Sequence, residues 1–317
     1  MASELLGERI AMLDHDGIDW RNVRHMTVMI DQTFRYDYPG RITGLRQRLM
    51  VVPPDRHRHQ RLLSHTLSVS GRNLETARSY DSFGNVVLDL GLDEVDGCVE
   101  FVTRAIVECD QSSGEQEDGG QEDGGQDDSV QEEGGHDDGG SGFDERFGVP
   151  SLLTRPDDAL RAVADEAMRS GARGPALAAL LCARVHDHFI YEGAVTTVET
   201  TAAEAWAGGR GVCQDYAHCM LVLCRLCGLP ARYVSGHLLG DGGSHAWVEL
   251  HVPGLAGRRR TLAFDPTHNR RAGPRYVTVA LGRDYLDVTP TSGTFQGPAA
   301  GELTTRKRAG VIRVEYL

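Results

Sequence analysis

The chain has 317 residues, of which 40% are hydrophobic and 6% aromatic, and its formal net charge is −13. That length and apolar content allow a hydrophobic core in one large domain or two smaller ones. Twelve acidic residues lie between Asp110 and Asp138, where there is no Lys or Arg, so the rest of the chain is nearly neutral. Lys and Arg are otherwise scattered and form no stripe, which argues against a nucleic-acid partner.

The N-terminus and the cysteines predict a cytoplasmic protein without a membrane partner. No stretch approaches the roughly 18 uninterrupted apolar residues of a membrane span. Charges at Glu4, Glu8 and Arg9 interrupt the region where a secretory leader would be apolar. The cysteines number seven, and four of them fall within 213–227 on one expected helix, which does not suit a disulfide framework. We therefore expect reduced thiols.

The first half of the chain is expected to be a β domain followed by a linker. Residues 1–22 show no clear pattern. From 23 to 109, short β-branched or aromatic runs alternate with turn residues, including an expected turn at Phe83–Asn85, which predicts a β-sandwich-like domain. Residues 110–148 contain five imperfect acidic pentads such as QEDGG and HDDGG. Such a tract has little to bury and repels itself, so we predict a disordered linker, with an interaction tail or a weak cation-binding segment as the alternatives.

Residues 149–317 are expected to form an α+β domain, because helical periodicity gives way to short strands. Helices are expected at Asp157–Ser170, at Pro175–Ile190 and within Gly211–Pro230, and a short turn or helix is expected at Thr200–Trp206. Strands are expected at Ala231–Leu239, Ala246–Val252, Thr261–Phe264, Tyr276–Leu281 and Val311–Leu317.

The stretch Gly211–Pro230, GVCQDYAHCMLVLCRLCGLP, predicts a reactive cysteine at the start of a buried helix. Gly211 frees the backbone before Cys213, and Gly228 and Pro230 supply stop signals. The free N–H groups and the dipole at a helix start favour an anion, so a thiol placed there loses its proton more easily. Cys213 is therefore the candidate nucleophile, and its own N–H is a candidate oxyanion donor.

Two later stretches supply a candidate base and a group to orient it. GSHAWVE places His245 at the head of a strand-like run, and LAFDPT places Asp265 at the end of another. Cys, His and Asp fit the nucleophile, base and orienting group of covalent acyl transfer. The structural alternatives are a packed cysteine, a buried histidine and a turn-forming aspartate before proline.

No metal site is expected. Cys224-x-x-Cys227 has no second ligand pair, so both cysteines are interpreted as core residues. His186-Asp-His188 and His57-x-His59 are weak metal-like pairs that we interpret as helix and loop surface.

Together, GVCQDYAH, GSHAWVE and FDPTHN resemble the three core motifs of the bacterial transglutaminase-like superfamily, which includes papain-like cysteine proteases. FRYDYP and YDSFGN resemble the N-terminal region of its bacterial members. The resemblance covers most of the chain apart from residues 1–22 and the acidic tract. It implies that the cysteine helix packs on an antiparallel sheet that carries the histidine and aspartate of a catalytic triad.

The resemblance also suggests further site residues. It implies a second oxyanion donor upstream of the cysteine, for which the indole N–H of Trp206 is the nearest candidate. Gln214, Asp215 and His218 match the CQDxAH string of the family. We expect Asp215 and His218 to organise the helix start or the pocket floor, and Gln214 and Asp215 are pocket candidates.

These inferences predict a transglutaminase-like cysteine enzyme with a protein or peptide substrate and no cofactor. Calcium, used by some animal relatives, has no evident site. Hydrolysis of a peptide or side-chain amide through a thioester acyl-enzyme is favoured over transfer to an amine. An amine channel is usually lined by aromatics, and only Trp206 and Trp247 lie in the core domain. The remaining alternative is a non-catalytic binding protein.

Overall fold

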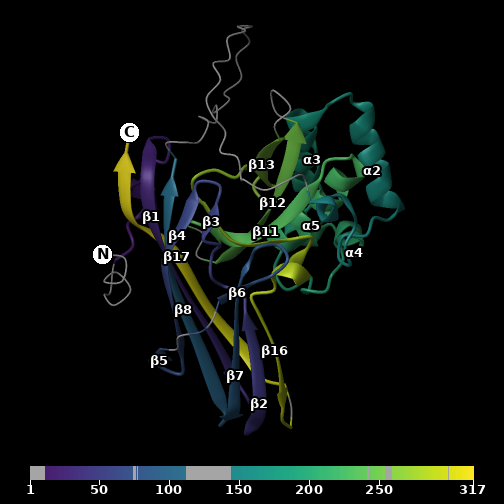
Figure 1. The fold of residues 1–317 in the computed structure, drawn as a ribbon. Coiled ribbons are helices and arrows are strands. Elements are labelled where there is room, and N and C mark those ends of the chain that lie inside the picture. The colour runs from purple at the N-terminus through teal and green to yellow at the C-terminus, as the bar shows by residue number, and fades with distance from the viewer. Residues whose placement is uncertain are drawn as a thin grey trace.

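The computed structural model describes residues 11–111, 144–240, 243–253, 259–298 and 300–317, apart from residues 74, 75 and 77. Two antiparallel sheets form a β unit (Figure 1). The larger has the strand order β17-β1-β8-β4-β3, with β5 on β4, and the smaller has the order β16-β2-β7-β6. The strands are β1 (Val23–Asp37), β2 (Ile42–Leu49), β3 (Arg56–His57), β4 (Gln60–Val69), β5 (Arg72–Asn73), β6 (Arg78–Tyr80), β7 (Val86–Val95), β8 (Cys98–Asp110), β16 (Thr291–Gln296) and β17 (Glu302–Tyr316).

The two sheets pack face to face, so the predicted β-sandwich is confirmed. In β2, buried Leu45 and Leu49 alternate with exposed Arg46 and Arg48, which is the period-2 pattern of a strand with one face in the core. Their core includes Phe34 of β1. The predicted turn at Phe83–Asn85 joins β6 to β7.

A second unit carries helices on one face of an antiparallel sheet, which confirms the α+β prediction (Figure 1). Its sheet has the order β14-β13-β12-β11-β15, and β9 and β10 form a small parallel pair beside the helices. The helices are α2 (Asp158–Arg169), α3 (Gly174–His188), α4 (Ala202–Gly208) and α5 (Cys213–Leu226), and the strands are β9 (Ile190–Tyr191), β10 (Arg210–Gly211), β11 (Ala231–Leu238), β12 (Ser244–Pro253), β13 (Arg259–Asp265), β14 (Arg270–Arg271) and β15 (Tyr276–Gly282). Short 3-10 helices are η1 (His15–Gly17), η2 (Glu145–Gly148) and η4 (Tyr285–Val288).

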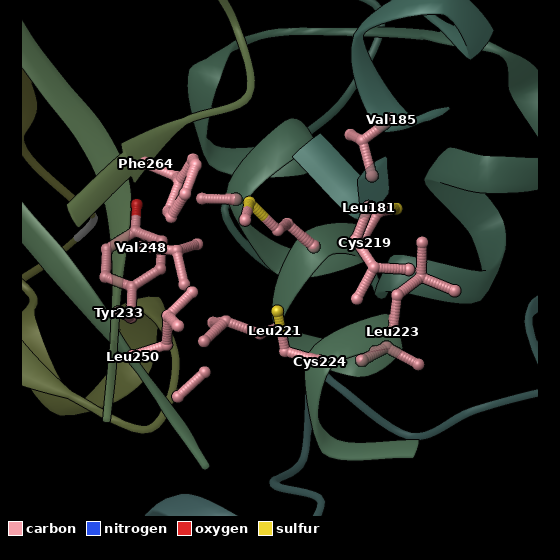
Figure 2. Packing of buried hydrophobic residues seen from close by; sticks show 14 of the residues in the cluster. Leu181, Val185, Cys219, Leu221, Leu223, Cys224, Tyr233, Val248, Leu250 and Phe264 are labelled. Atoms are coloured by element: carbon pink, nitrogen blue, oxygen red, sulfur yellow. The ribbon is translucent and has the colours of Figure 1, made fainter. Parts of the chain in front are cut away.

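Helix α5 is the centre of this second unit. Every residue from Gln214 to Arg225 is buried, because α2, α3 and α4 surround the helix on the sides that the sheet leaves open. Figure 2 shows Val248, Leu250 and Phe264 of the sheet on one side of α5, and Leu181 and Val185 of α3 on the other. The helix therefore holds its first residue in a rigid position.

The predicted domain boundaries differ from the structure at the C-terminal end. Residues 149–317 were expected to form the core unit, but β16 pairs with β2, and β17 pairs with β1 from Glu302 to Tyr316. The last strands therefore belong to the β unit. The segment after Thr291 completes both sheets of the sandwich, because β1 and β2 would otherwise be open edges.

The other predicted boundary regions are partly structured. Within the unassigned 1–22, Ile18 is buried in a core cluster, and the N–H of Leu13 donates to the carbonyl of Val311 at 2.7 Å. Of the predicted linker 110–148, Asp110 ends β8 and residues 145–148 form η2. Residues 112–143 lie outside the described part of the chain, so the prediction of disorder is untested. Within the described residues, none of the helices is long and apolar enough to cross a membrane.

The inner face of the larger sheet packs against two different partners. Towards one end of β1, Val28 and Ile30 contact Val277 and Val279 of β15 in the second unit. Towards the other end, Phe34 packs into the sandwich core. The larger sheet therefore packs one part of its inner face against the second unit and the other part against the smaller sheet.

Two side-chain amides hold the units together at β15, the edge strand of the second sheet. Gln60 donates to the Thr278 carbonyl at 2.7 Å and accepts from the Thr278 N–H at 2.9 Å. Asn85 forms the same pair of hydrogen bonds with Leu281, both at 2.7 Å. All four groups are buried, so the amides satisfy edge-strand backbone groups that would otherwise lack partners.

Arg225 fixes the end of α5 in place. Its guanidinium donates to the carbonyls of Phe147, Ala231 and Arg283 and to the hydroxyl of Thr154, at 2.6 to 3.1 Å. Burial lowers its pKa to about 10, and the carbonyl oxygens take the place of water around the charge.

We expect Arg225→Met to lower the free energy of unfolding by about 3 kcal/mol, because several buried acceptors lose their donor. Urea unfolding of purified variants measures this. Arg184→Met is the matched control: its partner Glu166 is exposed, so that ion pair contributes about 0–1 kcal/mol. Equal losses in the two variants would contradict the assignment.

Candidate active site

Cys213 is the first residue of α5, and its thiol is partly exposed. The helix starts there because Val212 is extended and its N–H donates to Asp215 Oδ2 at 2.8 Å. Asp215 also accepts from the Thr196 hydroxyl at 2.8 Å. Gly211 is required by this arrangement, since a Cβ there would overlap the Asp215 carboxylate. The expected role of Asp215 at the helix start therefore agrees with its hydrogen bonds.

His245, at the head of β12, lies between Cys213 and Asp265. Its Nε2 is 2.8 Å from Asp265 Oδ2, which leaves Nδ1 as the ring nitrogen for the hydrogen bond with the Cys213 side chain. Burial by itself lowers the pKa of His245, but the hydrogen bonds to Asp265 and Cys213 outweigh it and raise the pKa from 6.5 to about 9. The imidazole is therefore held in its protonated form near neutral pH.

Asp265 ends β13 and is fully buried. Its Oδ2 is the shared acceptor for His245 Nε2, the Tyr276 hydroxyl at 2.6 Å and His268 Nδ1 at 2.7 Å. Its Oδ1 accepts from the backbone N–H groups of Thr267 at 2.9 Å and His268 at 3.3 Å. Burial alone raises the pKa of Asp265, but these donors, led by His245, hold it well below its usual range. Asp265 therefore remains a carboxylate.

Tyr276 and His268 are site residues that sequence reasoning missed. His268 stands in FDPTHN, three residues after Asp265, which is close enough for its ring to fold back onto the carboxylate. Tyr276 opens β15 and reaches Asp265 across the sheet, and Arg270 Nε donates to its hydroxyl at 2.9 Å. Only the spacing of His268 could have been noticed, because nothing local marks Tyr276.

The same cluster is the one described group compact enough to hold a metal ion. Ligand atoms of His245, Asp265 and His268 all lie within 4.8 Å of one another. In the structure these atoms are engaged with each other, since both rings hydrogen-bond to Asp265 Oδ2. The arrangement fits an acid–base site, and the prediction of no metal stays a prediction.

The remaining pocket candidates are Gln214, on α5, and Trp206, on α4, and their roles stay predictions. Gln214 Nε2 donates to the Val198 carbonyl at 3.3 Å. Trp206 is mostly buried and stacks on His188 with ring centroids 3.6 Å apart. No contact described here joins Trp206 to Cys213, so its role as an oxyanion donor stays a prediction.

The other singled-out histidines are structural. His218 is buried and accepts from the Tyr285 N–H at 3.1 Å, and burial lowers its pKa to about 4. His188 Nε2 lies 2.8 Å from the Trp206 carbonyl. The expectation of a surface position is wrong for His57, which is buried between the two units with its Nε2 3.0 Å from Glu249 Oε1. The buried position of the ring is explained by its hydrogen bond with the buried Glu249 carboxylate.

Cys213 differs from the other cysteines, all of which are free. Burial raises the pKa of the thiols of Cys109 and Cys182 to about 12, and it also raises the pKa of Cys219, Cys224 and Cys227. Cys98 is exposed but has no histidine beside it in the described contacts. Cys213 is therefore the thiol that combines access with a basic partner.

Two family models match separate parts of the chain. The transglutaminase-like superfamily matches residues 161–258, which include Cys213 and His245. The bacterial transglutaminase-like N-terminal region matches residues 28–108.

Individual proteins resemble this chain as well. The crystal structure of a candidate cysteine protease from Cytophaga hutchinsonii superposes with a TM-score of 0.68 at 20% identity, covering 92% of this chain and 93% of that one, which shows a shared fold. Uncharacterised proteins of Mycobacterium tuberculosis and Mycobacterium leprae are 36% and 37% identical over 124 and 123 residues. Each match covers 36% of this chain, and the chain spans only 40% and 42% of those relatives.

We expect iodoacetamide at neutral pH to alkylate Cys213 faster than any other cysteine, with Cys98 as the internal exposed reference. His245→Gln is expected to slow the Cys213 reaction by about tenfold, because the thiolate loses its imidazolium partner. Peptide mapping by mass spectrometry measures both rates. Similar rates for Cys213 and Cys98 that do not respond to His245→Gln would remove Cys213 as the nucleophile.

The shared acceptor predicts an unusual effect of Tyr276→Phe. Without the tyrosine hydroxyl, Asp265 Oδ2 becomes a stronger acceptor for His245, so the pKa of His245 is expected to rise by about half a pH unit above about 9. NMR titration of the His245 ring measures this. Because the folded-state pKa is raised, protonated His245 stabilises the fold fully below pH 6.5, and that contribution disappears as the pH rises through about 9.

Tyr80→Phe is the matched control for this titration. It removes a hydrogen bond of the same length, 2.6 Å, to the exposed Asp55 and is expected to leave the pKa of His245 unchanged. An unchanged or lower pKa in Tyr276→Phe would show that the tyrosine does not share the carboxylate.

Proposed function

Because this chain belongs to the transglutaminase-like superfamily, we propose that it is a cysteine-dependent hydrolase of peptide or side-chain amide bonds. The observation that carries the proposal is the continuous arrangement of Cys213, His245 and Asp265. One ring nitrogen of His245 is fixed by a buried carboxylate at 2.8 Å, and the other is left for a partly exposed thiol.

In the acylation step, Cys213 Sγ attacks the carbonyl carbon of the amide as a thiolate. The carbonyl oxygen becomes an oxyanion, for which the N–H of Cys213 at the start of α5 is a suitable donor. His245, protonated at the nitrogen facing the thiol, gives its proton to the leaving amine, and a thioester remains. Asp265 holds the ring in place and stabilises its charged form throughout.

In the deacylation step, the now neutral His245 takes a proton from water, and the resulting hydroxide attacks the thioester carbon. Collapse of that adduct releases the carboxylic acid and regenerates the thiolate–imidazolium pair. Every proton in the cycle passes through His245, so the reaction needs no cofactor.

Transfer of the acyl group to an amine is the second candidate. It requires an acceptor channel that removes water from an ammonium group. The tryptophans of the second unit do not offer one: Trp206 is 9% exposed and stacked on His188, and Trp247 is 1% exposed beside Tyr276. This favours water as the acceptor.

The test is to incubate the purified protein with a library of peptides in the presence of excess primary amine and to follow the products by mass spectrometry. Cleaved or deamidated products with little amine incorporation, absent in Cys213→Ala, are the expected result. Dominant amine adducts would make the protein a transferase. No product of either kind, despite a reactive Cys213, would favour a non-catalytic binding protein.

A further inference from the structure

Lys307 is the only lysine in the chain, which otherwise uses 32 arginines for its positive charges. It lies in the middle of β17, in the β unit, far in sequence from the catalytic residues. Lysine presents a compact, mobile point charge, whereas arginine suits fixed bidentate pairs. A single lysine among so many arginines calls for a physical reason at its position.

Lys307 lies on the larger sheet, at the boundary between the part that packs on the second unit and the part that packs on the smaller sheet. Lys307 pairs with Gln32 on β1, and Gln32 pairs with Thr103 on β8, so the three form one row across neighbouring strands. On β1 the apolar contacts with the second unit end at Ile30, and those of the sandwich begin at Phe34. On β1 the buried polar residue Gln32 therefore lies between the two apolar contacts.

The ammonium of Lys307 projects from this row to the active site. Its Nζ is 3.2 Å from the hydroxyl of Ser244, the residue before His245, and 5.4 Å from the centre of the Phe34 ring. Burial lowers the pKa of Lys307, and the nearby Cys213 sulfur raises it. The β unit thus places a positive charge against the first residue of β12, next to His245 and within electrostatic range of Cys213.

No carboxylate of the described part of the chain pairs with this charge. Its ammonium contacts the hydroxyl of Ser244 and the ring face of Phe34, whereas the adjacent Arg308 pairs with Asp31 at 3.6 Å. Partly burying an ammonium without a counter-ion costs free energy. This free-energy cost is offset if a ligand brings an anion to the ammonium.

We propose that Lys307 binds a carboxylate of the substrate next to the scissile amide, so that the enzyme prefers acidic peptides. The carboxylate is either the side chain of Asp or Glu or the free C-terminus of a peptide. The preference for a substrate class rests on the hydrolase function proposed above, but the recognition of a carboxylate beside Cys213 can be tested without turnover.

Iodoacetate and iodoacetamide are suitable probes, because both alkylate a thiolate with loss of iodide and only the first carries a carboxylate. The rate constant for Cys213 with each reagent gives a ratio that cancels changes in the thiol itself. We expect Lys307→Met to lower the ratio of iodoacetate to iodoacetamide by about tenfold, the effect of losing a charge-assisted hydrogen bond. Lys307→Arg, which keeps the charge, should restore much of it.

Arg306→Met is the control, since it removes a neighbouring charge from an exposed residue on the opposite face of β17. It is expected to leave the ratio unchanged. If Lys307→Met slows both reagents equally, Lys307 acts on the thiol and the proposal is wrong. An unaltered ratio, or an equal fall in Arg306→Met, also overturns it.

A second measurement covers the case in which Lys307→Met does not fold. Reductive ¹³C-methylation of the native protein labels one lysine and the α-amino group while keeping the charge. N-acetylglycine should shift the lysine signal saturably, and N-acetylglycinamide should not. A lack of shift with both would reject carboxylate binding at Lys307.

If recognition is established, peptide pairs distinguish the two sources of the carboxylate. Asp-to-Asn or Glu-to-Gln changes beside the cleaved bond test side chains, and C-terminal amidation tests the terminus. Loss of cleavage with either change, matched by Lys307→Met, supports that source. Cleavage that depends on Lys307 but on neither carboxylate would refute the substrate preference and leave the hydrolase function standing.

An absence of cleavage in the native protein would count against the hydrolase function alone, because the alkylation ratio does not require it.

Discussion

The buried Asp265 carboxylate is the constraint on which the active site depends. A charge with no exposure is tolerated only when its oxygens are filled with donors, and Asp265 accepts from two imidazoles, a phenol and two backbone N–H groups. The backbone donors fix the carboxylate to its own turn. The side-chain donors then fix His245 from β12 and Tyr276 from β15 around it. The orientation of the His245 imidazole is thus a consequence of satisfying a buried charge.

Hydrogen bonds to buried polar groups also join the two units. Gln60 and Asn85 satisfy the edge of β15, the strand that carries Tyr276, and buried His57 meets Glu249 of β12. Strands next to the catalytic residues are therefore held by side chains of the β unit. Because β17 returns to pair with β1, the chain closes that unit only after the second unit has been made. The candidate site is therefore supported by both units.

Short sequence patterns predicted the helix start, the strands and the motif residues, because these features depend mainly on neighbouring residues. The start of α5 at Cys213 follows from an extended residue, a glycine and a capping aspartate, all within five positions. Expected strands such as Ala231–Leu239 agree with the structure to within a few residues, because apolar periodicity marks them. The Cys213, His245 and Asp265 group was recognisable because each sits in a distinctive short motif.

Long-range pairing left no comparable signal. The pairing of β17 with β1 joins residues nearly the whole chain apart, and it brings Lys307 to Ser244. Tyr276 reaches Asp265 because β15 pairs with β11 in the second sheet. His57 was misplaced because its burial depends on Glu249, a partner far along the sequence. A sequence without structure shows which residues are reactive by motif, but not which distant ones are brought beside them.

The charges gathered at the site bear on the choice between hydrolysis and amine transfer. In the reactive state the charges of the Cys213 thiolate and the Asp265 carboxylate are matched by those of the His245 imidazolium and the Lys307 ammonium. In the proposed acyl-enzyme the thiolate has become a thioester and His245 has given up its proton, so the ammonium of Lys307 loses its nearby anion. An approaching peptide carboxylate is attracted by the remaining ammonium. A lysine side chain arriving as acyl acceptor carries the same charge as Lys307 and is repelled. Water meets no such barrier. On the proposed role of Lys307, one electrostatic reason accounts for both a preference for acidic substrates and hydrolysis of the thioester.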